Sequence, residues 1–554
     1  MRNIKRMIGL TLCIGFAVGA AACRGSNNAD SRPTDESKTQ LTVGNVDGGY
    51  GKEWLTSAIA KFEEKFKDKV YETGKRGIQV SEHTDHEYHG LTNLETNIAQ
   101  GKRDVYFSES VNYETLIRKK LIEDISEAVE TPLTEFGEEK SISDKMFTQY
   151  NAEVYRGGKY YAVPYNIGNY GIVYNTELFE AENLYFGEDN NFVTSSAAKK
   201  GAGPDGKEGT YDDGLPRTFE EFYRLCDKMK EKGITPLVWT GKTLDYVNQT
   251  LYSLATDVAG AETMKNYMSL SGTVKVIDSL NDISDNGVTL SEITLNNSNG
   301  YKLFLNEGTY YALTFAKKLI SSGYVSESSS NGNYSHLDSE RDFLFGGQTV
   351  GGKTYQKIGM MFNGAWWYNE AADYFKLIVE EKGESADKAH RSFGMMPFPK
   401  ADESKLGASS IKDSQKSMCM VNAKAGAAQK EAAKDFIRFL HSDEMLREYA
   451  KLTDCQKPYE FDLGDETKLT AYGNSLYNLY QNSEIFAPAA SSNPCFVSQE
   501  KYFNEIFMNK GLGSEFVAKV FENKADLTVK GYMEKIQAYH NKTDYEKMFA
   551  SFIG

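Results

Sequence analysis

The sequence predicts a mixed α/β protein that is divided into at least two lobes. The chain has 554 residues, of which 40% are apolar and 25% charged, so it has the composition of a folded protein and is too long for one core. Helical stretches with one apolar face alternate with short runs of β-branched and aromatic residues. This alternation is typical of helices packed on a sheet.

The first unit is a strand followed by a helix. Residues 40–46, QLTVGNV, alternate between apolar and polar positions as a half-buried strand does. A second unit has a strand at 104–110 and a helix at 112–126. The helix of the first unit covers residues 51–67, and its apolar positions form one stripe: Trp54, Leu55, Ala58, Ile59, Phe62 and Phe66.

Further helices carry clear boundary signals. Residues 218–233 begin with Thr218 and Glu221 at the spacing of a capping box. Residues 430–451 predict a pair of amphipathic helices with a break near Ser442. We find no internal repeat, so the lobes are not copies of one short unit.

The N-terminal segment predicts export and a lipid anchor. Residues 1–22 combine basic residues, an apolar stretch and a small-residue ending, as a secretory signal does. The ending AAAC resembles the bacterial lipoprotein box, whose cysteine, here Cys23, is lipidated; Leu is usual at the first of these alanines. Simple cleavage beside an incidental cysteine is the alternative. Residues 23–40 are polar and predict a flexible tether, and no later run is long and apolar enough to cross a bilayer.

Charge and cysteine spacing exclude several classes of partner and site. The formal net charge of −15 opposes binding to phosphate backbones, so we expect no nucleic-acid partner. Four cysteines follow Cys23, and they are widely spaced without a C-x-x-C pair, which argues against zinc ribbons and redox motifs. Either a disulfide joins the third and fourth of them or all are buried thiols: Cys226, Cys419, Cys455 and Cys495.

Five segments in a fixed order resemble one known family. They contain a glycine turn before the first helix, a D-V strand, the motif G-K-x-Y-x-x-P before a strand ending in Y-N, the series D-F-x-x-G and G-x-W, and a helix reading E-A-A-x-x-F-I-x-F-L. The family is that of the extracellular solute-binding proteins (family 1) of bacterial carbohydrate ABC importers, similar to maltose-binding protein. The segments are 45–66, 97–126, 157–180, 341–370 and 417–444.

This resemblance implies a type II periplasmic-binding-protein-like fold with a ligand cleft between two lobes. It implies a monomeric receptor, without catalysis or a required cofactor, that captures an extracellular sugar and delivers it to a permease on the outer face of the cell membrane. The implied limits are 41–165 for lobe 1, 166–416 for lobe 2, 417–460 for the return to lobe 1, and 461–554 for a helical region that packs mainly on lobe 2.

The candidate ligand contacts are aromatic and planar polar residues. Aromatic rings cover the C–H faces of sugar rings, and carboxylates, amides and hydroxyls bind the sugar hydroxyls. For each candidate, a place in the core or in a solvated loop is the alternative. The aromatic candidates are Tyr50, Trp54, Tyr165, Trp239, Trp366 and Trp367, and the polar ones are Ser108, Glu109, Asn166, Asn169 and Asn363.

Two other patterns raise the possibility of metal binding. Residues 186–214 lack apolar periodicity, which predicts a long inserted loop, and carboxylates bunched around its glycines suit calcium. An ordinary exposed loop is the alternative. Three histidines at intervals of three residues suit zinc, which is the basis of a rival function; a polar loop or a helix start is the alternative for this segment. An exported glycan-active enzyme is another rival function. The calcium candidates are Asp205, Thr210, Asp212 and Asp213, and the zinc candidates are His83, His86 and His89.

Overall fold

The computed structural model describes residues 28–29, 32–284, 287–464, 467–487, 503–504, 506–507 and 516–553. The signal segment 1–22, Cys23 and Cys495 lie outside the described residues, and so does the candidate disulfide of Cys495 with Cys455. Within the range predicted as a tether, Arg32 pairs with Glu63, and β2 already begins at Thr39.

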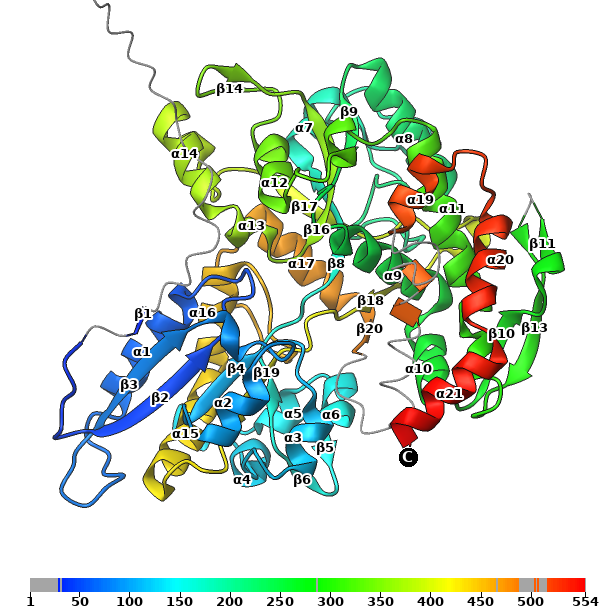
Figure 1. Ribbon diagram of the computed structural model, residues 1–554. Coiled ribbons are helices and arrows are strands. Elements are labelled where there is room, and N and C mark those ends of the chain that lie inside the picture. The colour runs from blue at the N-terminus through cyan, green and yellow to red at the C-terminus, as the bar shows by residue number, and fades with distance from the viewer. Residues whose placement is uncertain are drawn as a thin grey trace, which may run out of the picture.

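Lobe 1 is built on a six-stranded sheet with helices on both faces (Figure 1). In spatial order its strands are β1 (Asn28–Ala29), β3 (Ile78–Thr84), β2 (Thr39–Asn45), β4 (Val105–Ser108), β19 (Met418–Val421) and β7 (Val163–Pro164). Strands β2, β3 and β4 are mutually parallel, so their carboxyl ends meet at one edge of the sheet. The helices are α1 (Glu53–Lys65), α2 (Leu94–Gln100), α3 (Tyr113–Arg118), α4 (Ser126–Glu130), α5 (Ile142–Lys145), α6 (Thr148–Val154), α15 (Ala427–Leu440) and α16 (Asp443–Thr453).

Lobe 2 is built on a four-stranded sheet. In spatial order its strands are β17 (Phe393–Met396), β8 (Tyr170–Asn175), β16 (Ile358–Gly364) and β9 (Thr235–Val238), and a separate hairpin pairs β10 (Thr273–Ile277) with β13 (Leu290–Thr294). Its helices are α7 (Thr176–Glu182), α8 (Phe219–Glu231), α9 (Asp245–Ala259), α10 (Ala261–Ser269), α11 (Glu307–Ser321), α12 (His336–Leu344), α13 (Trp367–Glu370) and α14 (Ala372–Lys382).

The chain passes between the two sheets more than once. It leaves lobe 1 after β7 and enters lobe 2 at β8, so residues 165–169 cross between them. It returns between β18 (Ser409–Lys412) and β19, through residues 413–417. The predicted domain limits stay predictions.

The C-terminal part of the chain lies against lobe 2. Helix α17 (Ala471–Gln481) packs on β17, and β20 (Ser483–Phe486) pairs in parallel with β18. Helices α19 (Val517–Asn523) and α20 (Val529–Tyr539) pack on α11, and α21 (Lys542–Ile553) ends the chain beside them (Figure 1).

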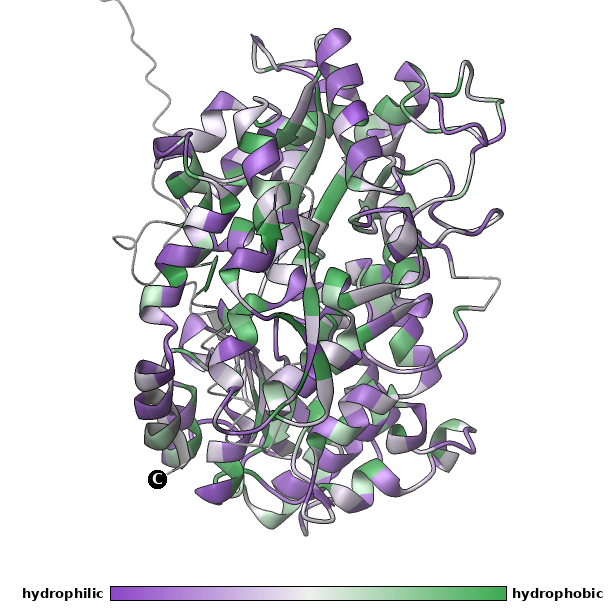
Figure 2. Cartoon of the chain, turned by 90° about the vertical axis from the view of Figure 1, so that its right-hand side faces the viewer, coloured by the Kyte–Doolittle hydropathy of each residue, from purple (hydrophilic) through white to green (hydrophobic). Residues whose placement is uncertain are grey.

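Apolar residues are concentrated in the central strands and on the buried faces of the helices, while polar residues predominate on the outer helices (Figure 2). The predicted helix at 218–233 is confirmed as α8, and Thr218 caps it by accepting a hydrogen bond from the backbone N–H of Glu221. The predicted pair at 430–451 is confirmed as α15 and α16, with Ser442 capping the second helix.

Two local predictions were wrong. The helix expected across 112–126 ends at Arg118, because Lys120 adopts a left-handed backbone conformation and Ile122 then bridges to Asn422. The histidine run was expected to be a polar loop or a helix start; this is wrong for His83, which lies in strand β3, whereas His86 does begin a short 3-10 helix, His86–Tyr88. Only the first three residues of β3 are buried, so the apolar pattern of this strand was too short to predict a strand that reaches His83.

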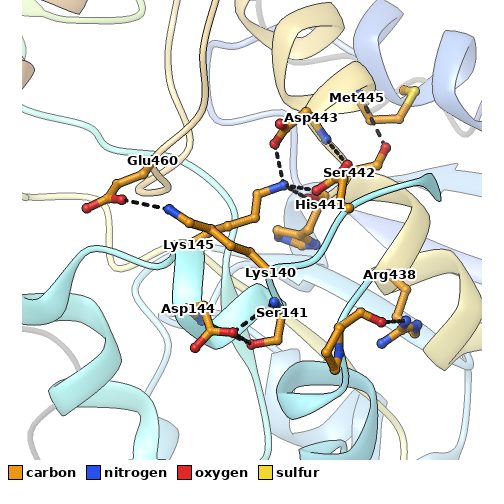
Figure 3. Close-up of polar contacts among 12 residues, drawn as sticks. Lys140, Ser141, Asp144, Lys145, Arg438, His441, Ser442, Asp443, Met445 and Glu460 are labelled. Atoms are coloured by element: carbon orange, nitrogen blue, oxygen red, sulfur yellow. Dashed lines mark hydrogen bonds and ion pairs between the residues drawn. The ribbon is translucent and has the colours of Figure 1, made fainter. Parts of the chain in front are cut away.

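Polar contacts tie α5 to the junction of α15 and α16 (Figure 3). The ammonium group of Lys145 donates to the carbonyl of His441 at 2.8 Å and pairs with Asp443 at 2.5 Å, although its side chain is only 2% exposed. Lys140 pairs with Glu460 at 3.4 Å nearby. These bonds hold the returning segment on lobe 1, so lobe 1 is a discontinuous but connected unit.

Cys226, Cys419 and Cys455 are free, buried thiols. Burial raises the pKa of Cys419 to about 12, so this thiol stays protonated and unreactive at neutral pH. Among the described residues, no helix is both long enough and apolar enough to span a membrane.

Candidate ligand cleft

A cavity of about 550 Å³ opens between the lobes at the carboxyl edge of the lobe 1 sheet. Lobe 1 supplies the loops that follow β2, β3 and β4, and lobe 2 supplies the end of α13. Polar groups gather here because the loops that follow parallel strands all lie at the same edge of the sheet. The lining residues are Val46, Asp47, Gly48, Gly49, Gly51, Thr84, Asp85, His86, His89, Glu109, Asn369 and Glu370.

Glu109 contributes a buried carboxyl group to this cavity. It follows β4 and is 4% exposed, and its Oε1 accepts no hydrogen bond from any residue that the structure describes. Burial, and then the neighbouring Asp47, Asp413 and Glu370, together raise its pKa to about 8. A β-carbon built on Gly48 would lie 1.6 Å from that Oε1, so only glycine lets the loop approach this carboxyl group.

The adjacent tryptophans Trp366 and Trp367 have different surroundings. They follow strand β16, and Trp367 begins helix α13. Trp367 is fully buried and packs against Phe343 and Phe393 in an aromatic cluster of lobe 2. Trp366 lies where the two lobes meet, because a β-carbon built on Gly49 would lie 2.4 Å from its Cδ1.

Trp366 belongs to an aromatic group drawn from both lobes. Its ring centroid lies 4.9 Å from that of Tyr170, 6.0 Å from that of Tyr50 and 6.4 Å from that of Tyr246. Tyr50 comes from lobe 1, and its buried hydroxyl has no partner among the described residues. Trp366 is 3% exposed in this arrangement, so its faces become available to a solute only when the lobes separate.

A buried polar network supports the lobe 2 side. Glu370 accepts from the Tyr246 hydroxyl at 3.3 Å and lies 3.5 Å from Nε2 of His336. Asn363 donates to Oε1 of Glu340 at 2.9 Å. Burial, and then the neighbouring Glu370, raise the pKa of Glu340 well above its usual value.

The remaining aromatic candidates from the sequence lie deeper. Trp54 packs against Phe107 and Tyr165 in lobe 1, with ring centroids 5.5 and 6.2 Å away. Trp239 is 1% exposed and packs on Phe362 in lobe 2. Their role as ligand contacts stays a prediction.

The polar candidates divide in the same way. Glu109 lines the cavity, whereas Ser108 donates to the carbonyl of Tyr88 beneath it. On the crossing segment, Asn169 accepts from the Tyr480 hydroxyl at 2.6 Å. Asn166 is fully buried, and neither polar atom of its side chain has a partner among the described residues.

Sequence reasoning missed several residues that the fold brings to the cleft. Asp47 follows β2 in the same glycine-rich loop as Tyr50, and its position after a strand was an available signal. Glu370 stands three residues after Trp367, but nothing local distinguishes it from other acidic residues. Tyr170 and Tyr246 come from distant parts of the chain, so only the fold shows their proximity to Trp366.

The calcium and zinc candidates stay predictions. Within the described part of the chain, no three His, Cys, Asp or Glu residues are grouped so as to hold an ion. His86 and His89 stack at 5.2 Å and line the cavity, whereas His83 lies in β3. The carboxylates of the inserted loop accept its own donors: Thr210 Oγ1 bonds to Asp212, Asp205 N bonds to Asp212, and Gly209 N bonds to Asp213.

Comparisons with known proteins agree with this architecture. A family model described as "bacterial extracellular solute-binding protein" matches residues 52–446, which confirms the resemblance that the five segments predicted. No curated protein sequence matches the chain. The family description implies an extracytoplasmic location.

Solved structures confirm the predicted fold class. A chitin oligosaccharide binding protein is 16% identical, with 92% of this chain and 99% of that chain covered and a TM-score of 0.54. RafE from Streptococcus pneumoniae in its apo form is 16% identical, with 93% and 100% covered and a TM-score of 0.54. RafE in complex with raffinose is 15% identical, with 92% and 100% covered and a TM-score of 0.53. At these identities the likeness shows the fold alone.

Proposed function

Because the chain belongs to the bacterial extracellular solute-binding protein family, we propose that it captures a sugar or oligosaccharide between its lobes and delivers it unaltered to an ABC importer. A lipid on Cys23 would hold the mature protein at the extracytoplasmic face of the cell membrane. The structurally similar proteins include one named for chitin oligosaccharides and one in complex with raffinose, which supports a glycan as the solute.

The observation that carries this proposal is the composition of the cleft. Both lobes line one cavity, and an aromatic group with Trp366 at its centre lies directly behind the Gly49 loop. Aromatic faces beside carboxylates and amides suit a ring with C–H faces and hydroxyl edges. Two crossing segments between the sheets provide the hinge that opening requires.

Calorimetric titration against a panel of mono- and oligosaccharides tests the proposal. We expect at least one tight ligand, and X-ray scattering should show that its binding makes the protein more compact. Trp366→Ala should weaken binding by about tenfold or more, since stacked aromatic contacts are lost. Trp367→Phe keeps an aromatic ring in the lobe 2 core and is the matched control, with affinity expected to stay unchanged.

Other outcomes of the same experiment would overturn the proposal. Absence of any binding across a broad panel would do so, and so would recovery of shortened glycans after incubation, which indicates an enzyme. Zinc retained by untagged protein, and lost on substitution of His86, would favour the metal receptor instead. Lipid attachment is tested separately by mass spectrometry of the membrane fraction, where Cys23→Ser should release the protein.

A further inference from the structure

We propose that the glycan bound in the cleft carries a free amino group, whose ammonium ion pairs with Glu109. This inference rests on the proposed function, because it names the class of glycan that the same cavity takes. Three observations carry it: the charge of the cavity wall, the unpaired buried oxygen of Glu109, and the aromatic group beside them.

The wall of the cavity is acidic. Four carboxylates line it, and no lysine or arginine is among its described lining residues; the acids are Asp47, Asp85, Glu109 and Glu370. Lys52 acts electrostatically on Asp47 but does not line the cavity. Burial and the neighbouring His86 lower the pKa of His89, so this imidazole is neutral at neutral pH and adds no compensating charge.

Glu109 needs a donor that the described part of the protein does not provide. Its Oε1 is buried without a partner, although the equally buried Asp413 accepts from the Tyr150 hydroxyl at 2.8 Å and from the backbone N–H of Gln415 at 3.0 Å. A sugar hydroxyl supplies one neutral hydrogen bond. An ammonium ion supplies up to three donors together with the opposite charge, so it satisfies both the oxygen and the surrounding acidic field.

The aromatic group favours an amino sugar over a bare cation. A metal ion needs several ligands at short distance, and no such group of three exists among the described residues. Trp366 and Tyr50 meet at the loop that contains Gly49, next to Glu109, so a ring with an apolar face fits beside the carboxyl group.

Proton release on ligand binding distinguishes an ion pair at Glu109 from a purely structural role, because a structural role predicts no proton release. Before binding, Glu109 holds a proton at pH 6.5; on binding, the ammonium ion stabilises the carboxylate and the proton leaves to the buffer. The groups that act on Glu109 are acidic or phenolic: Asp47, Asp413, Glu370, Tyr50, Tyr165, Tyr170 and Tyr449. We therefore expect release of about one proton per amino glycan, and none with a neutral glycan.

The test compares glycans that differ only at one carbon. Cello-oligosaccharides carry a hydroxyl at C2, chitin oligosaccharides an acetylated amine and chitosan oligosaccharides a free amine; hexoses and the matching hexosamines extend the series. Calorimetry at pH 6.5, in two buffers of different ionisation enthalpy, gives both affinity and proton release. We expect the free amine to bind at least about 30-fold more tightly than its hydroxyl counterpart.

Glu109→Gln should remove this preference and the proton release, while it keeps the size of the side chain. Glu64→Gln makes the same side-chain substitution at an exposed position and should leave both unchanged. Thermal unfolding of each variant confirms that it is folded.

The outcomes separate this inference from the proposed function. If neutral or acetylated glycans bind as tightly as the amines, or if Glu109→Gln keeps the preference, the amino-sugar inference is overturned and the sugar-receptor proposal stands. If no glycan of any series binds, both are overturned.

Discussion

Two glycine-rich regions of this molecule hold a buried carboxyl group in nearly the same way. In the cleft, Gly48 packs against Glu109, and in the inserted loop a β-carbon on Gly203 would lie 2.5 Å from Cγ of Asp212. Asp212 is fully buried, yet its oxygens accept from Thr210 Oγ1 at 2.7 Å and from Asp205 N at 2.9 Å. Glu109 has no such donor for its Oε1 among the described residues.

The difference separates a structural site from a binding site. A buried carboxylate whose hydrogen bonds are made locally stabilises its own loop, whereas an unpaired one costs free energy until a ligand arrives. In the inserted loop, the hydrogen bonds to the buried carboxyl group are therefore made by the loop itself. In the cleft, we expect the solute to supply the missing donor. Four measurements test this difference between the two regions.

The largest effect is expected at the loop. Asp212→Ala removes the fully buried group that accepts from Thr210 Oγ1 and Asp205 N, so the free energy of unfolding should fall by about 2–4 kcal/mol. Urea unfolding followed by circular dichroism measures this. Glycan affinity should stay unchanged in the folded variant; unchanged stability with lost affinity would reverse the roles that we assign to the two regions.

Glu109→Gln should act in the opposite direction on the ligand-free protein. The folded-state pKa of Glu109, about 8, lies above its ordinary value of 4.5. Between these pH values the folded protein keeps a proton on Glu109 that the unfolded chain has lost. The wild type therefore loses stability as the pH rises through this window, and the variant does not. At pH 4 the two proteins should be about equally stable, and by pH 6, about 1.5 pH units above the ordinary pKa, the variant should be more stable by about 2 kcal/mol. A constant difference across pH would contradict this.

A smaller effect is expected from the glycines. Gly49 has φ of +88°, and a methyl group there would strike Trp366, so Gly49→Ala should hinder closure and weaken glycan binding about tenfold. Gly209 has a similar φ of +79° in the inserted loop with nothing within 4 Å of an added β-carbon. Gly209→Ala is thus a matched control, and its glycan affinity should equal that of the wild type by calorimetry.

The smallest effect is expected from Thr210→Val. It removes one hydrogen bond to Asp212, so the free energy of unfolding should fall by about 1 kcal/mol. Differential scanning calorimetry measures the change with and without millimolar calcium. We expect the melting temperature to be independent of calcium in both proteins; a rise with calcium that Thr210→Val abolishes would show that the loop binds the ion.

Much of the fold was predictable because its signals are local. The stripe of α1, the cap of α8 at Thr218 and the break at Ser442 each depend on residues within one or two helical turns. The helix at 112–126 was predicted too long because its end depends on a bridge from Ile122 to Asn422, some 300 residues away. Tertiary pairing of this kind overrides local helix propensity.

The site was predictable only in part. Glu109 and Trp366 were selected because the sequence places them after a strand and in a family motif, and the structure puts one in the wall of the cleft and the other at the lobe interface. Trp367 carries the same chemistry one position later, but the turn after β16 directs it into the lobe 2 core. Adjacent residues in a turn direct their side chains differently, and the residue type alone does not show which direction each takes.

The α/β class, the family and most helix boundaries could be predicted from the sequence alone, since they follow from periodicity, caps and ordered motifs. The folded structure was needed to show that Asp47, Glu109 and Glu370 line one cavity and that the buried Oε1 of Glu109 has no donor among the described residues. The reason is physical: burial and hydrogen-bond satisfaction depend on segments far apart in the chain, and the parallel strands and crossing segments bring these together.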